Sequence, residues 1–264
     1  MEQQNKQEQQ QDKQKQKKKY KFFVTSDVHS FFRPFKQALE AAGFDETDPT
    51  HYLIICGDLF DRGPDTVRLY HYIKSLQDRA ILIYGNHELL LESLVIRGYY
   101  FYNDITNGTV DTETQFLASS IRMDEVMSWM KSKYVWYAET DSYIFVHSWV
   151  PIDPFTGLLY QDWRKAPDGL WKEATWGNPF EDAKNPKVFP NEGKKIVFGH
   201  WGTYWKWGEV LDGVPEDRPF SLSKFDMYED ENIVALDACT ALSGKCNVFV
   251  FEDTKLPKLG RKRK

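Results

Sequence analysis

The most constraining feature of this sequence is a set of five apolar runs, each of strand length and each followed closely by Asp, His or Asn. In an open α/β sheet, the carboxyl ends of neighbouring strands share one edge, and ligands bind there. Side chains that follow five such strands are therefore expected to lie together on one rim. The runs are FFVT, YLIIC, AILIY, YIFV and KIVF, and the residues after them are Asp27 and His29, Asp58, Asn86 and His87, His147, and His200.

Helical patterns between these runs indicate an α/β fold. The segment PFKQALEAAG begins on a proline and ends on a glycine, and the segments PDTVRLYHYIKSLQ and HELLLESLVIRG have the spacing of amphipathic helices. Two further apolar runs, IVAL from Ile233 and NVFVF from Asn247, predict the last strands. A chain of 264 residues can form one large core, so we expect a single domain over residues 20–254.

The two ends of the chain differ in composition from this domain. Residues 1–19 are rich in Gln and Lys and are expected to form a disordered tail, and residues 255–264 are expected to form a basic C-terminal tail. The formal charge of the whole chain is −5; because the tails carry +3 and +6, the body carries −14. An acidic body repels polyanions, so we expect that the main domain does not bind long nucleic acid. For the same reason, a phosphorylated substrate would need positively charged side chains at its binding site.

Cysteine content and hydropathy favour a cytoplasmic protein. The three cysteines, Cys56, Cys239 and Cys246, lie in or beside apolar runs, which suits buried thiols in a reducing compartment better than a set of disulfides. No segment has the composition of a signal peptide or of a membrane span, so no membrane association is expected. We expect a monomer.

The residues after the five strands offer carboxylate, amide and imidazole ligands, a set that suits Mn, Fe or Zn. A single ion would not use so many ligands, whereas two ions that share a carboxylate would. Paired ions of this kind stabilise the attacking and leaving oxygens of a phosphoryl displacement. Asp58 is the expected bridging ligand, because Gly57 before it allows a tight backbone turn.

At this point the sequence resembles the calcineurin-like metallophosphoesterases, and within them the phosphoprotein phosphatase type. The pair GDLFDRG and GNHE is specific, and the likeness runs from about Tyr20 to Glu252, where LDACTALSGKCNVFVFE resembles the family's final hairpin. The resemblance implies two mixed β-sheets packed face to face and flanked by helices, a four-layer αββα sandwich. The matching motifs are Asp27 with His29, GDLFDRG at 57–63, GNHE at 85–88, His147 and His200.

The resemblance also implies two divalent metal ions, with Mn expected and Fe or Zn as alternatives. A hydroxide that bridges the two ions would attack phosphorus in line. One ion would be held by Asp27, His29 and Asp58, and the other by Asp58, Asn86, His147 and His200.

The same resemblance gives roles to the remaining motif residues. Arg62 would bind the phosphate oxygens with its forked donors, His87 would protonate the leaving oxygen, and Asp61 would orient His87. Glu88 is expected to open its helix rather than to bind metal, since acids favour the first turn.

Four positions differ from what the family usually has or need explanation. Trp149 and Trp201 follow His147 and His200 closely. Their indoles could stack on a nucleobase or pack against the loops, and we favour packing. Gly202 stands where many other metallophosphoesterases have a histidine, which favours the phosphoprotein phosphatase branch. A second phosphate-binding arginine is missing from the stretch LWKEATWGNPF, and Arg164 is the remaining candidate.

Three functions are consistent with these motifs. The first is hydrolysis of phosphoserine or phosphothreonine in proteins, because an acidic body favours basic phosphopeptides. The alternative is symmetric hydrolysis of diadenosine tetraphosphate or of another nucleotide. The third is a non-catalytic module that binds phosphorylated ligands, although the complete set of ligands argues against it. Nucleic-acid binding by the terminal GRKRK would rest on that short charge run alone.

Overall fold

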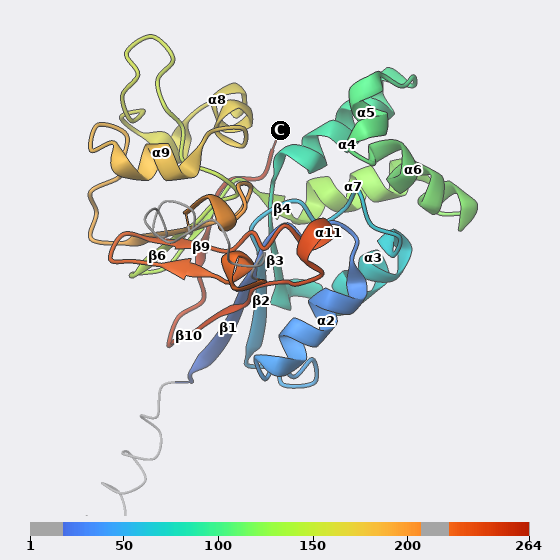
Figure 1. The fold of residues 1–264 in the computed structure, drawn as a ribbon, viewed down its shortest axis with the longest axis horizontal. Helices are drawn as coiled ribbons and strands as arrows, with labels where there is room; N and C mark the ends of the chain where they lie inside the picture. The colour runs from blue at the N-terminus through green and yellow to red at the C-terminus, as the bar shows by residue number, and fades with distance from the viewer. Residues whose placement is uncertain (1–17, 207–221, 264) are drawn as a thin grey trace, which may run out of the picture.

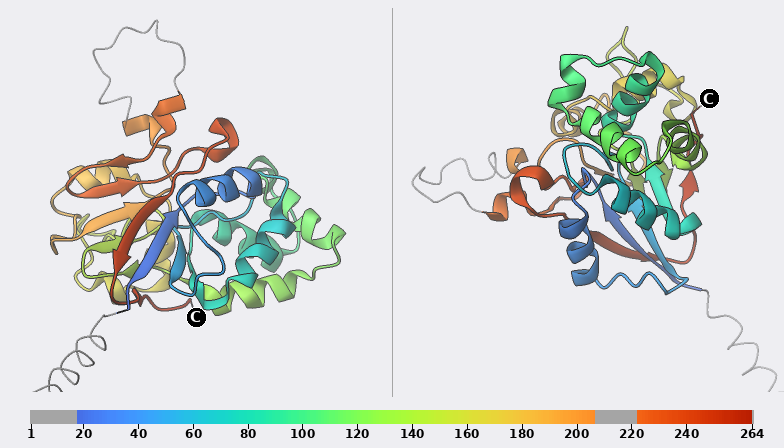
Figure 2. Two further views of the ribbon diagram at one scale, coloured as in Figure 1. Left: turned by 90° about the horizontal axis from the view of Figure 1, so that it is seen from below. Right: turned by 90° about the vertical axis from the view of Figure 1, so that its right-hand side faces the viewer.

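In a computed structural model of the chain, the described residues are 18–206 and 222–263, so nearly all of the tail expected over residues 1–19 lies outside them. The described residues form two β-sheets packed face to face, with helices on the outer faces (Figure 1). The predicted αββα sandwich is therefore confirmed. Figure 2 shows the two sheets edge-on and the helices on either side.

The first sheet holds the three N-terminal strands that the sequence predicts. Four strands are parallel, and one edge strand is antiparallel to its neighbour. In spatial order the strands are β10 (Phe249–Asp253), β1 (Tyr20–Thr25), β2 (His51–Ile55), β3 (Ala80–Ile83) and β4 (Tyr134–Val135).

The second sheet holds the strands that precede His147 and His200. Its three central strands, β6, β7 and β9, are parallel, and the flanking strands are antiparallel. In spatial order the strands are β11 (Lys258–Leu259), β5 (Ala138–Glu139), β6 (Tyr143–Phe145), β7 (Lys195–Phe198), β9 (Ile233–Ala235) and β8 (Tyr228–Glu229).

Side chains alternate between the two faces of each strand, and this divides the core into two layers. In β1, Phe22 and Val24 point into the space between the sheets, and Phe23 points to the helices. Rings from both sheets meet between them, because Phe22 and Phe145 each stack on Phe251 at 4.9 and 5.6 Å between ring centroids. Full burial of each such ring contributes roughly 1.5–3 kcal/mol to folding, so this layer fixes the two sheets against each other.

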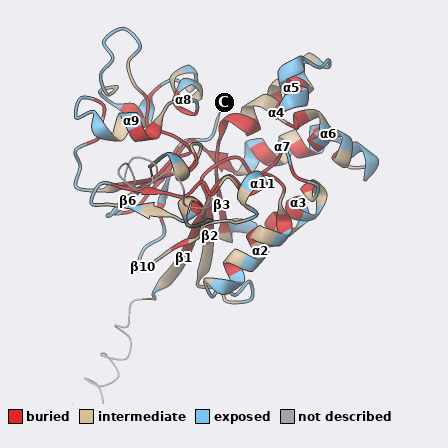
Figure 3. Ribbon diagram, in the orientation of Figure 1, coloured by how far each residue is buried: buried red, intermediate tan, exposed pale blue. Residues whose placement is uncertain are grey.

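The helices cover the outer faces of both sheets and bury their apolar sides (Figure 3). In α2, the buried residues Phe32, Phe35 and Leu39 recur at helical spacing and face the first sheet. The α-helices are α2 (Phe32–Ala41), α3 (Thr66–Ser75), α4 (Asn86–Arg97), α5 (Tyr102–Thr106), α6 (Thr109–Ala118), α7 (Met123–Lys133), α8 (Asp168–Ala174), α9 (Pro179–Lys184) and α11 (Thr240–Ser243). Short 3₁₀ turns span Gln77–Arg79, Trp163–Lys165 and Leu222–Phe225.

The C-terminal segment differs from its expected form. The described residues after 254 are not a separate basic tail: β11 pairs with β5, Arg261 forms an ion pair with Asp168 at 2.7 Å, and Arg263 pairs with Glu92. These two arginines thus find acidic partners on the domain, and the last described residues lie between α4 and α8 (Figure 1).

The stretch LDACTALSGKCNVFVFE is also not a hairpin. It leaves β9 in the second sheet, forms α11 and returns as β10 in the first sheet, so it crosses from one sheet to the other. All three cysteines are free thiols; Cys56 is buried, as expected, whereas Cys239 and Cys246 are only partly buried. Among the described residues, no helix combines the length and the apolar composition that a bilayer crossing requires.

Candidate metal centre

All six expected metal ligands lie together, but they come from two sheets rather than from one edge. Residues after β1, β2 and β3 meet residues after β6 and β7, because the sandwich brings the carboxyl ends of both sheets to one side. The six side chains are buried or nearly so. They are Asp27, His29, Asp58, Asn86, His147 and His200.

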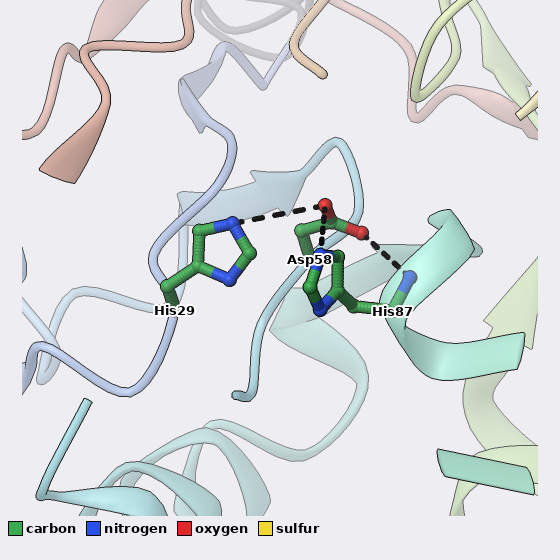
Figure 4. A group of neighbouring side chains, drawn as sticks. All are labelled: His29, Asp58 and His87. Atoms are coloured by element: carbon green, nitrogen blue, oxygen red, sulfur yellow. Dashed lines mark hydrogen bonds and ion pairs between the residues drawn. The ribbon is translucent and has the colours of Figure 1, made fainter. Parts of the chain in front are cut away.

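Asp58 lies at the centre of this cluster. Its two carboxylate oxygens face different neighbours: Oδ2 is 3.8 Å from Nε2 of His29, and Oδ1 is 3.4 Å from Nε2 of His147. Figure 4 shows the carboxylate of Asp58 between the rings of His29 and His87. Asp58 belongs to two groups of donors, each of which could hold an ion. The first group is Asp58 with His29 and His87, and the second is Asp58 with His147 and His200.

The remaining expected ligands approach the same two groups. Nε2 of His147 is 2.8 Å from Oδ1 of Asn86 and 3.2 Å from Nδ1 of His200. Asp27 lies on the other side, with Oδ1 4.0 Å from Nε2 of His29. Its second oxygen accepts the backbone N–H of His200 at 2.9 Å, which links the ends of β1 and β7.

Backbone geometry at the site is unusual and supports a functional role. Asp27, His29, Asp58 and His200 all have positive φ, between 50° and 67°. Left-handed backbone costs about 1–3 kcal/mol at non-glycine residues and persists mainly where function requires it. The turns after these strands are therefore held in conformations that point the side chains inward.

Glycines before the ligands provide the necessary space. A Cβ atom on Gly85 would lie 2.1 Å from Oδ1 of Asp58, and one on Gly199 would lie 2.0 Å from Oδ2 of Asp27. Neither distance is possible between non-bonded atoms, so both carboxylates occupy room that only glycine leaves free.

Three histidines present an unprotonated nitrogen to the cluster. His29 and His147 each donate Nδ1–H to a backbone carbonyl, of Phe60 at 3.0 Å and of Cys56 at 2.8 Å. His200 makes a hydrogen bond with the backbone of Trp176. This arrangement fixes the tautomer and turns the other ring nitrogen toward Asp58, as in histidines that bind metals.

Burial keeps these three histidines neutral. It lowers the pKa of His29 and of His147, and it lowers the pKa of His200 to about 3. A neutral imidazole has a lone pair available for a metal ion, so protonation does not compete with binding near neutral pH.

The carboxylates need more positive charge than nearby protein groups provide. Burial, together with neighbouring Asp237 and Asp58, raises the pKa of Asp27 well above its usual value. Burial also raises the pKa of Asp237 to about 6. Burial acts in the same direction on Asp58, but the surrounding histidines outweigh it and lower the pKa of Asp58. Because buried carboxylates are costly without cations, this set of donors fits divalent metal ions.

His87 differs from the other histidines of the site. Its Nδ1 donates to Oδ2 of Asp61 at 2.7 Å, and the Asp61 carboxylate is fully buried and accepts hydrogen bonds from Thr109 and Thr112, each at 2.8 Å. Burial opposes charge on His87, but Asp58 and Asp61 outweigh it and raise the pKa of His87. His87 is therefore suited to hold a proton rather than an ion.

Arg62 lies at the exposed mouth of the site. Its guanidinium donates to Nε2 of His29 at 3.0 Å, and its other terminal nitrogen lies 3.1 Å from Nε2 of His87. An ion that binds Nε2 of His29 therefore requires Arg62 to release that nitrogen. The guanidinium is then free to bind an anion at the mouth of the site.

Two other expectations concern residues away from the cluster. Arg164 is not a second phosphate ligand, because it forms ion pairs with Glu139 and Glu192, at 2.7 and 2.5 Å, on the second sheet. Trp149 packs in the core at 2% exposure, as expected, and Trp201 is half-buried against Trp205.

Three residues have roles in the site that were not predicted from the sequence. Asp237 follows β9, and the pattern of an apolar run and then an acid, applied to IVAL, would have identified it. Glu88 does open α4, but its carboxylate also accepts the backbone N–H groups of Asp58 and Leu59. Trp176 lies with its ring centroid 6.2 Å from that of His200 and is 50% exposed, and nothing in its sequence context indicates this.

Known proteins resemble this chain in both sequence and fold. A family model described as calcineurin-like phosphoesterase matches residues 20–228. A symmetrical bis(5′-nucleosyl)-tetraphosphatase of Nitrosospira multiformis is 31% identical over 126 residues, which cover 48% of this chain and 42% of that protein. One of Buchnera aphidicola is 39% identical over 69 residues, 26% of this chain and 24% of that protein. The matched part spans less than half the length of these relatives.

Two solved structures share the fold. One is of a protein proposed to be a diadenosine tetraphosphatase, with a TM-score of 0.54 and 16% identity over 92% of this chain and 95% of that chain. The other is a cold-active protein-tyrosine phosphatase of a Shewanella species, with a TM-score of 0.52 and 14% identity over 92% and 80%. Because the family model covers more than half of the sequence, the chain belongs to the calcineurin-like phosphoesterase family, whose members use divalent metals.

Proposed function

We propose that this protein is a hydrolase with two divalent metal ions that cleaves dinucleoside polyphosphates. The observation that carries the proposal is the position of Asp58, which is shared by two groups of donors. A shared carboxylate is the feature that joins two ions into one catalytic unit.

The proposed ligands divide between the two sides of Asp58. Asp27 and His29 would hold one ion with it, and the other three expected ligands would hold the second. The metals, when bound, acidify a water molecule and offset negative charge on the phosphoryl group. Mn is the proposed metal, with Fe or Zn as alternatives, because the donors are oxygen and imidazole nitrogen. The second set of ligands comprises Asn86, His147 and His200.

His87 and Arg62 would act on the substrate itself. The raised pKa of His87 keeps a proton available for the leaving oxygen, and the buried Asp61 carboxylate holds the ring in place. Arg62 is an exposed cation whose guanidinium lies 3.1 Å from Nε2 of His87, and its fork matches two phosphate oxygens.

Two observations support a dinucleotide over a phosphoprotein, which reverses the order expected from the sequence. The curated relatives described above are named symmetrical bis(5′-nucleosyl)-tetraphosphatases. Trp176 also offers a half-exposed indole beside His200, and stacking on an aromatic ring is a common way of binding a nucleobase.

A phosphopeptide is the second candidate. The charge of −14 on residues 20–254 would attract basic peptides that carry a phosphoryl group. Unlike the exposed indole, this charge is spread over the whole domain, so it supports a class of partner without locating a binding site.

The test is a panel of substrates with the Mn-loaded protein. Diadenosine tetraphosphate, a phosphoserine peptide and a mononucleotide are compared by kcat/KM, with Asp58→Asn as the inactive control. We expect the dinucleotide to be preferred and to give two identical nucleotide products. A preference for the phosphopeptide would contradict the proposed substrate, and full activity in Asp58→Asn would contradict the metal site.

A further inference from the structure

A cavity of about 370 Å³ lies between α4 and α8, next to the metal centre. Leu89, Leu90 and Ile96 of α4 give it an apolar wall, and the indole of Trp176 lines it from the segment after α8. Small-molecule sites in proteins are commonly ~300–1,000 Å³ and mostly apolar with a few polar groups. This cavity, which we call the α4–α8 cavity, therefore has the size and the lining of a ligand site.

Two features place the α4–α8 cavity near the reacting phosphate. Trp176 lines it and also has its ring 6.2 Å from that of His200. The helix α4 begins with Asn86 and His87 at the metal centre, and Leu90 lies about one turn further along, roughly 4.5 Å by the rise of an α-helix. A ligand that reaches both places needs only a short chain between its reacting phosphorus and its far end.

Cations outnumber acids in the lining of this cavity. Arg97, Lys172 and Arg263 face a single acid, Glu92, which pairs with Arg263. Arg97 is also engaged, by Asp104 at 2.5 Å. Lys172 has no hydrogen bond or ion pair with any described side chain, so its ammonium is available to a ligand. A basic cavity on a domain with a charge of −14 over residues 20–254 is a specific feature, and it suits a phosphate.

We propose that the α4–α8 cavity binds the nucleoside phosphate at the far end of the substrate, beyond the phosphorus that is attacked. This inference rests on the proposed function and extends it. The base stacks on the indole of Trp176, and Lys172 binds an oxygen of the adjoining phosphate. The polyphosphate chain then runs along the first turns of α4 to Arg62 and the metal centre.

Two larger cavities lie away from the metal centre. One of about 470 Å³ is lined by Tyr143 and Lys195, which begin β6 and β7, so it lies at the end of the second sheet opposite to the metal centre. Another of about 600 Å³ is an open surface on α7 around Arg122 and Trp129. Neither includes a residue that contacts the metal centre.

The test measures substrate preference in Trp176→Ala and Lys172→Met. The measured quantity is kcat/KM for diadenosine tetraphosphate divided by kcat/KM for p-nitrophenyl phosphate, which has no distal nucleotide. We expect this ratio to fall by at least about tenfold in both variants, mainly through KM for the dinucleotide. Trp176→Phe keeps an aromatic face and is expected to stay within about threefold of the wild type.

Lys165→Met is the matched control for the charge. Lys165 is 83% exposed at its side chain and pairs with Asp162, outside the cavity, so we expect the ratio to stay at the wild-type value. An equal fall in Lys165→Met would mean that general charge, not the α4–α8 cavity, attracts the substrate.

Other outcomes separate failure of the cavity from failure of the proposed function. If the wild type cleaves the dinucleotide and both variants show the wild-type ratio of kcat/KM values, the proposed role of the α4–α8 cavity is wrong, while the proposed function stands. A parallel loss of both activities would also overturn the proposed role of the cavity, because Trp176 would then act only through His200. A wild-type protein that cleaves p-nitrophenyl phosphate but not the dinucleotide would overturn the proposed substrate and the cavity with it.

Discussion

The carboxylate of Glu88 accepts the backbone N–H of Asp58 at 3.0 Å and so joins the first turn of α4 to the loop that carries the central carboxylate of the site. It also accepts the N–H groups of Leu59 and Gly85, each at 2.8 Å. Glu88 is buried, and burial raises its pKa to about 7. One side chain thus positions the proposed ligands Asp58 and Asn86 relative to each other.

Glu88→Gln tests this positioning role. A glutamine has one acceptor oxygen, and its amide N–H₂ would face backbone N–H groups, so at least one of the three hydrogen bonds is lost. We expect the affinity for Mn to fall by about 10–100-fold, as for other residues that support metal ligands. Titration with Mn measures the change, with Glu113→Gln on α6 as the control. Unchanged Mn affinity in Glu88→Gln would mean that the loop holds its shape without this carboxylate.

His87→Gln separates a proton donor from a metal ligand. If His87 only donates a proton, the variant keeps its bound metal while kcat on phenyl phosphate falls by about 10²–10⁴-fold. The loss on p-nitrophenyl phosphate is smaller, because p-nitrophenolate leaves with little need of a proton. Metal analysis and kcat on both esters give the answer, with exposed His71→Gln as control. Loss of a metal equivalent in His87→Gln would make it a ligand instead.

Asp61→Asn tests the effect of charge on His87. Burial favours the neutral ring, and the carboxylates of Asp58 and Asp61 raise the pKa of His87 against it. Removal of one carboxylate lowers that pKa. Since an acid is active only while protonated, the high-pH side of the rate profile moves to lower pH, by about 1 unit. The pH profile of kcat/KM on phenyl phosphate measures this shift, and exposed Asp111→Asn should leave it in place. A shift to higher pH would contradict the assignment.

Gly199→Ala tests the space around Asp27. The new Cβ would lie 2.0 Å from Oδ2 of Asp27, so the carboxylate or the backbone must move. We expect the melting temperature to fall by about 3–10 °C, from ~1–3 kcal/mol of overpacking, together with weaker Mn binding. Gly169→Ala is the control, since nothing lies within 4 Å of its Cβ and alanine favours the helix. Equal melting temperatures for Gly199→Ala and Gly169→Ala would mean that the short distance between residue 199 and Asp27 does not affect stability.

The motifs predict the centre of the site well because each residue follows a strand directly. A strand of known direction delivers the next one to three residues to its carboxyl end, so Asp58 and His147 have little freedom to lie elsewhere. That the two belong to different sheets is a property of the sandwich, and only the family resemblance indicated it. Asp237 obeys the same pattern and could have been found in this way.

Residues on longer connections could not be placed from sequence. Arg164 and Trp176 both lie between the late histidines, and nothing local distinguishes the one that pairs with Glu139 from the one that reaches His200. The positions of such residues depend on tertiary packing. The same holds for β11, whose two residues become a strand only because the edge of β5 accepts them.

Anomalous diffraction from crystals of the Mn-loaded protein tests whether Asp58 is shared by two ions. We predict two Mn peaks about 3.5–4 Å apart, with the carboxylate of Asp58 bound to both, Asp27 and His29 on one side, and His147 and His200 on the other. A single peak, or two peaks that do not share Asp58, would contradict the proposal that this residue joins two ions into one site.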